Sequence, residues 1–237
     1  MTRDPDSPLS ALVAIHQALI RRADPDEPAG ALYPRAGDAR YGWWPSFELT
    51  PYRAADPGEL DLGGVESFHD LASGQIQAAI RRVFDIEGPL HFDLLGDRIL
   101  AAAGAGRMGR RIRERIENEL EDLRAAGEIE QSGEYWARPR QFLRPPYRDW
   151  SDVEDKHRKL EYVAPSELMV CLFHAVLDDE GAGIDDVMNR GIYAIGFPRL
   201  TASARERLEE PIQALCDRGV FHEIGGCLYL AKDFFLR

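Results

Sequence analysis

The amino-acid sequence predicts a mainly helical α+β protein, in which small β-hairpins follow groups of helices and an irregular N-terminal arm precedes them. Three observations predict this class. Apolar residues recur at helical spacing after residue 72, glycines end those patterns, and the whole pattern occurs twice. Hydrophobic residues make up 44% of the 237 positions, which is enough apolar material for one or two cores.

The repetition is visible as matching residues at a fixed distance. Arg113–Glu117 recurs 92 residues later as Arg205–Glu209, with leucine in place of isoleucine. This short match alone could arise by chance. Further residues match at the same distance: Leu123 with Leu215, Gly104 with Gly196, Gly127 with Gly219, and Gly133 with Gly225. We therefore expect a duplicated unit of about 60 residues.

Residues 1–72 precede the duplication. Leu9–Arg22 has the apolar spacing of a short amphipathic helix, whereas residues 23–66 are rich in proline, glycine and aspartate. The sequence Gly42-Trp43-Trp44-Pro45 lies in this arm. We expect its tryptophans to hold the arm against the body, because disordered linkers contain few aromatic residues.

The first repeat is expected over residues 73–140. Apolar spacing predicts helices near Ile76–Phe84 and Phe92–Leu100, and a third from about Arg107 to Ala126 that ends at Gly127. Short β-type runs on both sides of Ser132-Gly133 then predict a hairpin. Three helices followed by a β-hairpin is the pattern of a winged helix, so we expect tandem winged-helix repeats.

The second repeat is expected over residues 164–237, after a connector at 141–163. Its predicted elements are Glu167–Leu177, Ile184–Ile195, Ser203–Arg218 and a hairpin around Gly225-Gly226. Ser203 and Glu206 have capping-box spacing, which supports a helix start there. Pro211 would remove a hydrogen bond inside that helix, so the helix should be kinked or begin later.

The charge balance and the cysteines limit the classes of protein. The chain has 41 acidic and 29 basic residues, a formal net charge of −12, and no apolar run long enough to span a membrane. The N-terminal MTRDPDSPL lacks the basic and apolar regions of a secretory signal. Cys171, Cys216 and Cys227 form no CxxC pair, which favours reduced thiols. We expect a cytoplasmic protein without a membrane segment.

The sequence offers little that points to catalysis. It contains no phosphate-loop, nucleophile-elbow, zinc-protease or dinucleotide fingerprint, so we expect no catalytic residue, no cofactor and no metal. A single histidine on an apolar helix, such as His174, is more typical of a core residue than of a ligand.

Several short motifs resemble a known family. They are Glu87-Gly88-Pro89-Leu90-His91, Arg98-Ile99, Gly104, Arg107, Gly109, Arg111-Ile112, Ala164-Pro165-Ser166-Glu167 and Gly196-Phe197-Pro198-Arg199. They resemble a domain of unknown function at the C-terminus of large bacterial superfamily 1 helicase-like proteins, often just after a restriction-endonuclease-like segment. The resemblance implies association with DNA-processing or defence machinery. It implies no ATPase activity, because the chain is too short for helicase motor domains and lacks their phosphate loop.

The third helix of the first repeat is the candidate nucleic-acid reader. Winged helices commonly place this helix in the major groove, and its N-terminal dipole favours phosphate. Its first half carries five arginines: Arg107, Arg110, Arg111, Arg113 and Arg115. Helical spacing puts Arg107, Arg111 and Arg115 on one face, where only Arg115 has an acid four residues later, Glu119. This face is open to nucleic-acid phosphate, and the alternative is a solvated or intramolecular face. Arg110 and Arg113 each have a glutamate four residues later, a spacing at which the two arginines could simply be ion-paired.

A second basic stretch follows the predicted wing. Of four segments along the chain, only residues 138–163 carry more bases than acids, seven against five. Arg138, Arg140, Arg144 and Arg148 alternate there with aromatic residues, a combination that can hold phosphates and stack on bases. The alternative is a connector held to the body by its aromatic side chains.

Two functions are therefore open. The first is a non-catalytic accessory module that binds DNA, duplex or forked, beside a helicase or nuclease partner. The second is a protein-interaction scaffold that uses winged helices as docking surfaces, which the charge of −12 favours because nucleic acid would be repelled on average. The third helix of the second repeat, with Arg205 and Arg207 among Glu206, Glu209 and Glu210, is close to neutral and better suited to protein contact.

Overall fold

The structure is a computed structural model that describes residues 43–63, 67–179 and 181–231. The helix expected at Leu9–Arg22 and most of the arm lie outside these ranges. The described part has six α-helices and two three-stranded antiparallel sheets, which confirms the expected α+β class. None of the helices in these ranges is long and apolar enough to cross a membrane.

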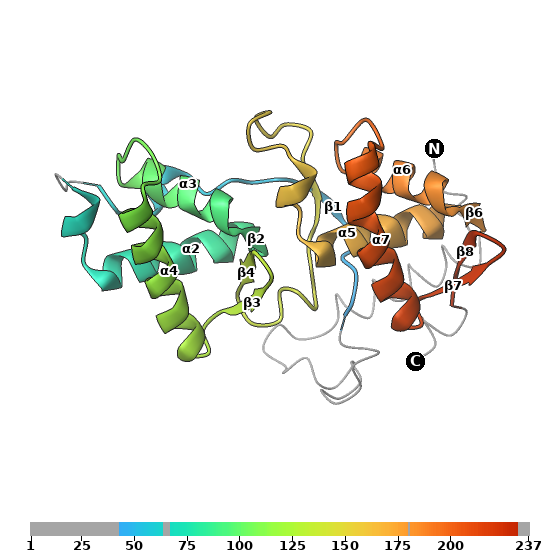
Figure 1. The fold of residues 1–237 in the computed structure, drawn as a ribbon, viewed down its shortest axis with the longest axis horizontal. Helices are drawn as coiled ribbons and strands as arrows, with labels where there is room; N and C mark the ends of the chain where they lie inside the picture. The colour runs from blue at the N-terminus through green and yellow to red at the C-terminus, as the bar shows by residue number, and fades with distance from the viewer. Residues whose placement is uncertain (1–42, 64–66, 180, 232–237) are drawn as a thin grey trace. The chain divides into compact units, whose positions relative to one another are not determined.

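The described residues form two compact units (Figure 1). The first unit contains residues 50–142 and 150–164, and the second contains 43–49, 143–149 and 165–231. The connector expected at 141–163 is thus shared between them. A short strand, β1 (Leu49–Pro51), lies where the chain leaves the second unit for the first.

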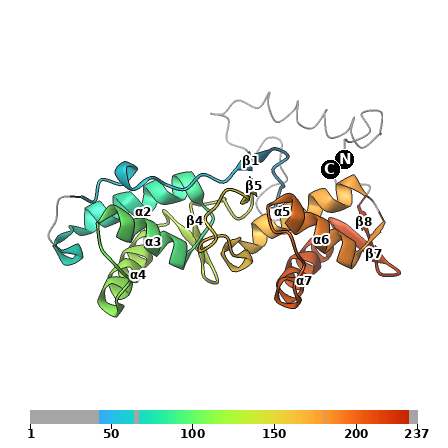
Figure 2. The same ribbon diagram turned by 90° about the horizontal axis from the view of Figure 1, so that it is seen from above.

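The first unit is built from three helices and a small sheet. Its elements are α2 (Ser73–Glu87), β2 (Leu90–His91), α3 (Phe92–Ala102), α4 (Arg110–Ala125), β3 (Glu130–Ser132) and β4 (Tyr135–Ala137), with 3-10 turns at Pro57–Glu59, Phe68–Asp70 and Leu160–Tyr162. Strand β4 lies between β2 and β3. Helix α2 packs against both α3 and α4 (Figures 1 and 2). The apolar stripe predicted for the third helix forms the core, because Ile116, Leu120 and Leu123 are buried.

The second unit is also built from three helices and a small three-stranded sheet. Its elements are β5 (Tyr147–Asp149), α5 (Pro165–Asp178), β6 (Ala182–Gly183), α6 (Ile184–Ala194), α7 (Ala202–Asp217), β7 (Phe221–Ile224) and β8 (Cys227–Leu230). Helix α5 is buried along most of its length and packs against α6 and α7. Trp43 and Phe47 of the arm contact Phe173 of α5, as expected of aromatic residues that hold the arm to the body. His174 is a core residue whose Nε2 lies 2.8 Å from the carbonyl oxygen of Ser46.

The element boundaries repeat at the distance found in the sequence. Helices α2, α3 and α4 and strand β2 each begin 92 residues before α5, α6, α7 and β6, respectively. The two sheets also have the same strand order, with the last strand in the middle. Each unit therefore follows one plan of helix, short strand, two helices and hairpin.

The matching glycines occupy the same backbone conformation in both repeats. Gly104, Gly127 and Gly133 have φ of 64°, 73° and 58°, and Gly196, Gly219 and Gly225 have φ of 93°, 66° and 61°. Positive φ strains residues with a side chain, which explains why glycine recurs at these turns.

Three local expectations were wrong. Helix α4 begins at Arg110 rather than Arg107, because Gly109 is extended and forms the N-cap. Helix α7 is capped by Thr201, whose Oγ1 accepts a hydrogen bond from the backbone N–H of Ala204, and not by Ser203. That helix begins early and continues through the buried Pro211, so the later start is wrong.

Candidate nucleic-acid interface

Two arginines of α4 form the ion pairs that their spacing predicts. Arg110 Nε lies 2.7 Å from Glu114 Oε1, and Arg113 Nη1 lies 3.3 Å from Glu117 Oε1. Arg113 also donates from Nη2 to Asp93 Oδ1 on α3 at 2.9 Å. These side chains are between 46% and 90% exposed, so each pair contributes little to stability and can open toward a stronger anion.

Arg115 ties helices together. Its Nε lies 2.9 Å from Glu119 Oε1, and its Nη2 donates to Ser73 Oγ at the start of α2 at 2.9 Å. Glu119 is buried and also accepts a hydrogen bond from Gln77 Nε2 of α2 at 2.9 Å. The guanidinium is therefore engaged in packing α4 against α2.

Arg107 and Arg111 are in a different situation. Both are exposed, and neither is paired with a carboxylate anywhere in the ranges that the structure describes. Arg107 lies in the loop before α4, so the helical stripe expected from Arg107 to Arg115 does not exist as such. The two residues instead flank the helix start, one before Gly109 and one in the first turn.

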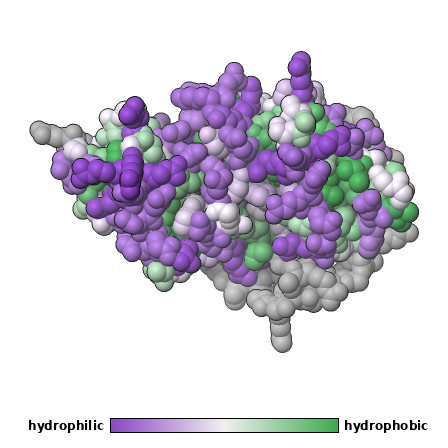
Figure 3. Space-filling view, in the orientation of Figure 1, coloured by the Kyte–Doolittle hydropathy of each residue, from purple (hydrophilic) through white to green (hydrophobic). Residues whose placement is uncertain are grey.

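The start of α4 is itself electropositive. Its N-cap Gly109 offers no side-chain acceptor, and the first turn contains no acidic residue. The backbone N–H groups of a first turn have no partner within the helix, and the helix dipole adds to their attraction for anions. Figure 3 shows mostly hydrophilic residues on the face of the first unit that it presents.

The second basic stretch does not act as one set of side chains. Arg138 Nε donates to Asp85 Oδ1 at 2.8 Å, which holds it against α2. Arg140 has an exposed side chain and lies at the end of the hairpin, where its backbone N–H donates to Glu130 Oε1 at 3.0 Å. Arg144 and Arg148 belong to the second unit. Arg148 is buried with its guanidinium against the fully buried Glu167 carboxylate, so it is structural and unavailable to a ligand.

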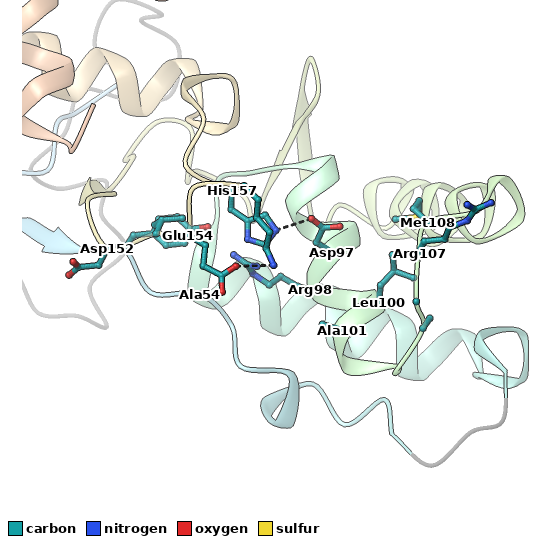
Figure 4. A pocket seen from close by; sticks show the side chains of 15 residues that line it. Ala54, Asp97, Arg98, Leu100, Ala101, Arg107, Met108, Asp152, Glu154 and His157 are labelled. Carbon is teal, nitrogen blue, oxygen red and sulfur yellow. Dashed lines mark hydrogen bonds and ion pairs between the residues drawn. The ribbon is translucent and has the colours of Figure 1, made fainter. Parts of the chain in front are cut away.

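Beside the start of α4 the first unit contains a pocket of about 710 Å³ that sequence reasoning missed (Figure 4). Its lining comes from residues 52–54, helix α3, the loop before α4 and residues 152–157. His157 Nε2 lies 3.0 Å from Asp97 Oδ2, and Arg107 forms part of the lining. No sequence pattern predicts this pocket, because the residues that line it are far apart along the chain.

A buried carboxylate supports one wall of the pocket. Glu87 is fully buried at the end of α2 and accepts hydrogen bonds from Ala55 N at 2.7 Å, from Arg98 Nε at 2.9 Å and from the Tyr52 hydroxyl. These contacts fix residues 52–55 and Arg98 in place. In the segment 152–157, Lys156 Nζ lies 2.8 Å from Glu154 Oε2, and this hydrogen bond and the charge of Lys156 lower the pKa of Glu154.

The third helix of the second repeat has no comparable cationic start. Arg205 pairs with Asp185, and the position of Arg111 is taken by Ser203. Arg199 is exposed at the position of Arg107. The two repeats thus share a backbone plan but differ in surface charge at the corresponding helix.

One comparison with known proteins gives a match, which covers the first part of the first repeat and the residues just before it. Residues 66–114 match the sequence model of a family described as a protein of unknown function, DUF3320. We found no match among curated proteins or among solved structures. The matched range contains Glu87, Arg98, Arg107 and the beginning of α4. This part of the chain is therefore similar to a domain of unknown function.

Proposed function

We propose that each repeat is a winged helix and that the chain is a non-catalytic nucleic-acid-binding module. The order of helix, strand, two helices and hairpin, with the last strand in the middle of the sheet, supports the winged-helix assignment. In that fold the helix before the hairpin, here α4, is the one that commonly enters the major groove of DNA.

One observation carries the proposal. Arg107 and Arg111 stand exposed on either side of an uncapped helix start, while the other arginines of α4 hold carboxylates or neighbouring helices. Two unpaired guanidinium groups beside unsatisfied N–H groups suit a phosphate of a nucleic-acid backbone. Arg110 and Arg113 would join them when phosphate replaces their carboxylate partners, which are Glu114 for Arg110 and both Glu117 and Asp93 for Arg113.

The overall charge of −12 does not prevent such binding. Screening over about 8 Å at physiological salt allows a local cationic surface to act separately from distant acidic residues. The affinity should be modest and should fall as salt rises, with a slope of about −0.9 in log K against log salt for each phosphate neutralised, because counterions are released.

The proposed setting is DNA processing or defence, beside a helicase or nuclease partner. This rests on the resemblance of motifs in both repeats, and the family match over residues 66–114 adds only a domain of unknown function. All three cysteines carry free thiols, which supports a reducing compartment such as the cytoplasm.

Fluorescence anisotropy with labelled duplex and forked DNA at low salt tests the proposal. The double variant Arg107→Ala/Arg111→Ala should lose at least tenfold in affinity, as expected when two charge-assisted contacts to phosphate are removed. Arg124→Ala is the matched control, because Arg124 lies at the other end of α4 and pairs with Glu121. Absence of binding to any DNA, or equal losses in both variants, would contradict the proposal.

A protein-interaction scaffold remains the second candidate, and an observation in the second unit favours it. The side chains of Tyr193 and Ile224 are 70% and 66% exposed, which is unusual for large apolar residues. A pull-down from the native host after nuclease digestion separates the two functions. A scaffold would retain its partner, whereas a module that joins its partner through DNA would lose it.

A further inference from the structure

A buried histidine lies at the start of α3, where the helix meets the sheet of the first unit. His91 is 6% exposed, and its Nδ1 accepts a hydrogen bond from the backbone N–H of Asp93 at 3.1 Å, which makes it the N-cap of α3. Its Nε2 lies 3.3 Å from Glu134 Oε2 in the turn between β3 and β4. Because Nδ1 is an acceptor, the ring is neutral and carries its one proton on Nε2.

The charged groups in contact with this imidazole, within the described ranges, are both carboxylates. One is Glu134, and the other is the Asp93 side chain, whose Oδ2 lies 3.9 Å from Nδ1. Each can accept a hydrogen bond from a ring that has taken up a second proton.

Two tyrosine rings complete the surroundings of His91. Tyr135 on β4 and Tyr162 in the last 3-10 turn pack against it, with ring centroids 5.3 Å and 5.0 Å away. Lys159 Nζ lies 5.1 Å from the centroid of the Tyr162 ring and pairs with Glu161 at 3.3 Å, so its charge is already balanced. Protonation of His91 therefore meets two acceptors and no unbalanced cation among these neighbours.

The Asp93 carboxylate also holds an arginine of the proposed interface. Its Oδ1 accepts a hydrogen bond from Arg113 Nη2 at 2.9 Å, while the guanidinium lies over the Phe92 ring, 4.4 Å from the ring centroid. Glu117 is the second carboxylate partner of Arg113, at 3.3 Å. Asp93 thus has one oxygen toward Arg113 and the other toward His91.

The second repeat has the same ion pair without the histidine. The corresponding residues, 92 positions later, are Arg205 and Asp185, and they are paired. The position of His91 is taken by Gly183, which caps α6 without a side-chain hydrogen bond. The ion pair is therefore common to both repeats, whereas the histidine belongs only to the repeat with the cationic helix start.

A second proton on His91 changes the bonding at Nδ1. This atom can then no longer accept from the Asp93 backbone N–H and must donate, and Asp93 Oδ2 is an acceptor within reach. We propose that protonation of His91 draws the Asp93 carboxylate away from Arg113 and frees this arginine for nucleic-acid phosphate. The first unit then binds nucleic acid more tightly as the pH falls through the range in which histidine titrates, about pH 8 to 5. This inference rests on the proposed function.

Anisotropy titrations with duplex DNA at about pH 8 and about pH 5.5 measure the effect. In about 0.1 M salt the wild type should bind about eightfold more tightly at the lower pH, because one further phosphate contact adds about 0.9 to the magnitude of the salt slope. His91→Asn should lack this gain, since asparagine can accept the cap hydrogen bond but does not titrate. His222→Asn is the matched control, because it removes an exposed histidine of the second repeat and should keep the gain.

A second variant tests the carboxylate and does not disturb the buried ring. The Asp93 side chain is 48% exposed, so Asp93→Asn should fold. It should bind DNA at about pH 8 as tightly as the wild type does at about pH 5.5. Asp185→Asn makes the same change of charge at the corresponding ion pair of the second repeat and should keep the wild-type dependence on pH.

NMR spectroscopy of the free protein follows the switch without DNA. The signals of the Asp93 backbone amide and of the Arg113 guanidinium should shift with the same midpoint as the His91 ring. If the ring does not titrate between about pH 5 and 8, or if it titrates while these signals stay constant, the inference is overturned whether or not DNA binds.

The DNA titrations separate this inference from the proposed function. Binding in which the wild type and His91→Asn gain equally at low pH overturns the inference and leaves the proposed function standing. Absence of binding at both pH values contradicts the proposed function, and the inference falls with it.

Discussion

Replacement of Glu87 by alanine should destabilise the first unit strongly. The carboxylate is fully buried and accepts hydrogen bonds from Arg98, Ala55 and Tyr52. Its removal leaves the Arg98 guanidinium, whose side chain is only 11% exposed, without its buried counter-charge. Breaking a buried ion pair on one side costs about 3–5 kcal/mol, which is a large share of the stability of a small domain.

Urea denaturation measures this loss. With a slope of roughly 1–3 kcal/mol per molar urea, the midpoint of the first unit should fall by more than about 1 M. Glu117→Ala is the control, because the Arg113–Glu117 pair is exposed and worth less than about 1 kcal/mol. Hydrogen exchange adds a local readout, since the amide of Ala55 should lose protection. A midpoint shift no larger than that of Glu117→Ala, with Ala55 still protected, would refute the reasoning.

Two further predictions concern the turns and the thiols. Gly127→Ala and Gly219→Ala should each destabilise their own unit by about 1–2 kcal/mol, because both glycines have positive φ. The backbone strain is the whole cost, since an added Cβ would meet no neighbouring atom at either position. Thermal melts that show no loss of stability for either variant would contradict the shared turn. In the folded chain, iodoacetamide should modify Cys216 and Cys227 well before Cys171, because burial raises the pKa of the Cys171 thiol and removes it from solvent. Mass spectrometry after brief labelling checks this order, and equally fast modification of Cys171 would contradict it.

The helices and hairpins were predictable because their signals are local. The spacing of Ile116, Leu120 and Leu123 identified α4, and the matching glycines identified its end. Strands β2 and β6 were missed, since two residues are too few to show an alternating pattern. The start of α4 was misplaced because a glycine N-cap gives no side-chain signal.

The site was predictable only in part. The i to i+4 spacing correctly gave the pairs of Arg110 and Arg113, because both partners lie on one helix. The pairing of Arg138 with Asp85 and the buried Arg148–Glu167 pair depend on contacts between distant segments, which no local pattern reveals. The pocket was not predicted either, because its lining residues also come from distant segments.

The salt dependence of DNA binding tests the role of the α4 start most directly. The logarithm of the association constant is plotted against the logarithm of salt concentration for the wild type and for Arg107→Ala/Arg111→Ala. If each arginine neutralises one phosphate of duplex DNA, the slope of the variant should be smaller in magnitude by about 1.8. An identical slope in the two proteins would show that neither arginine contacts phosphate and would contradict the account.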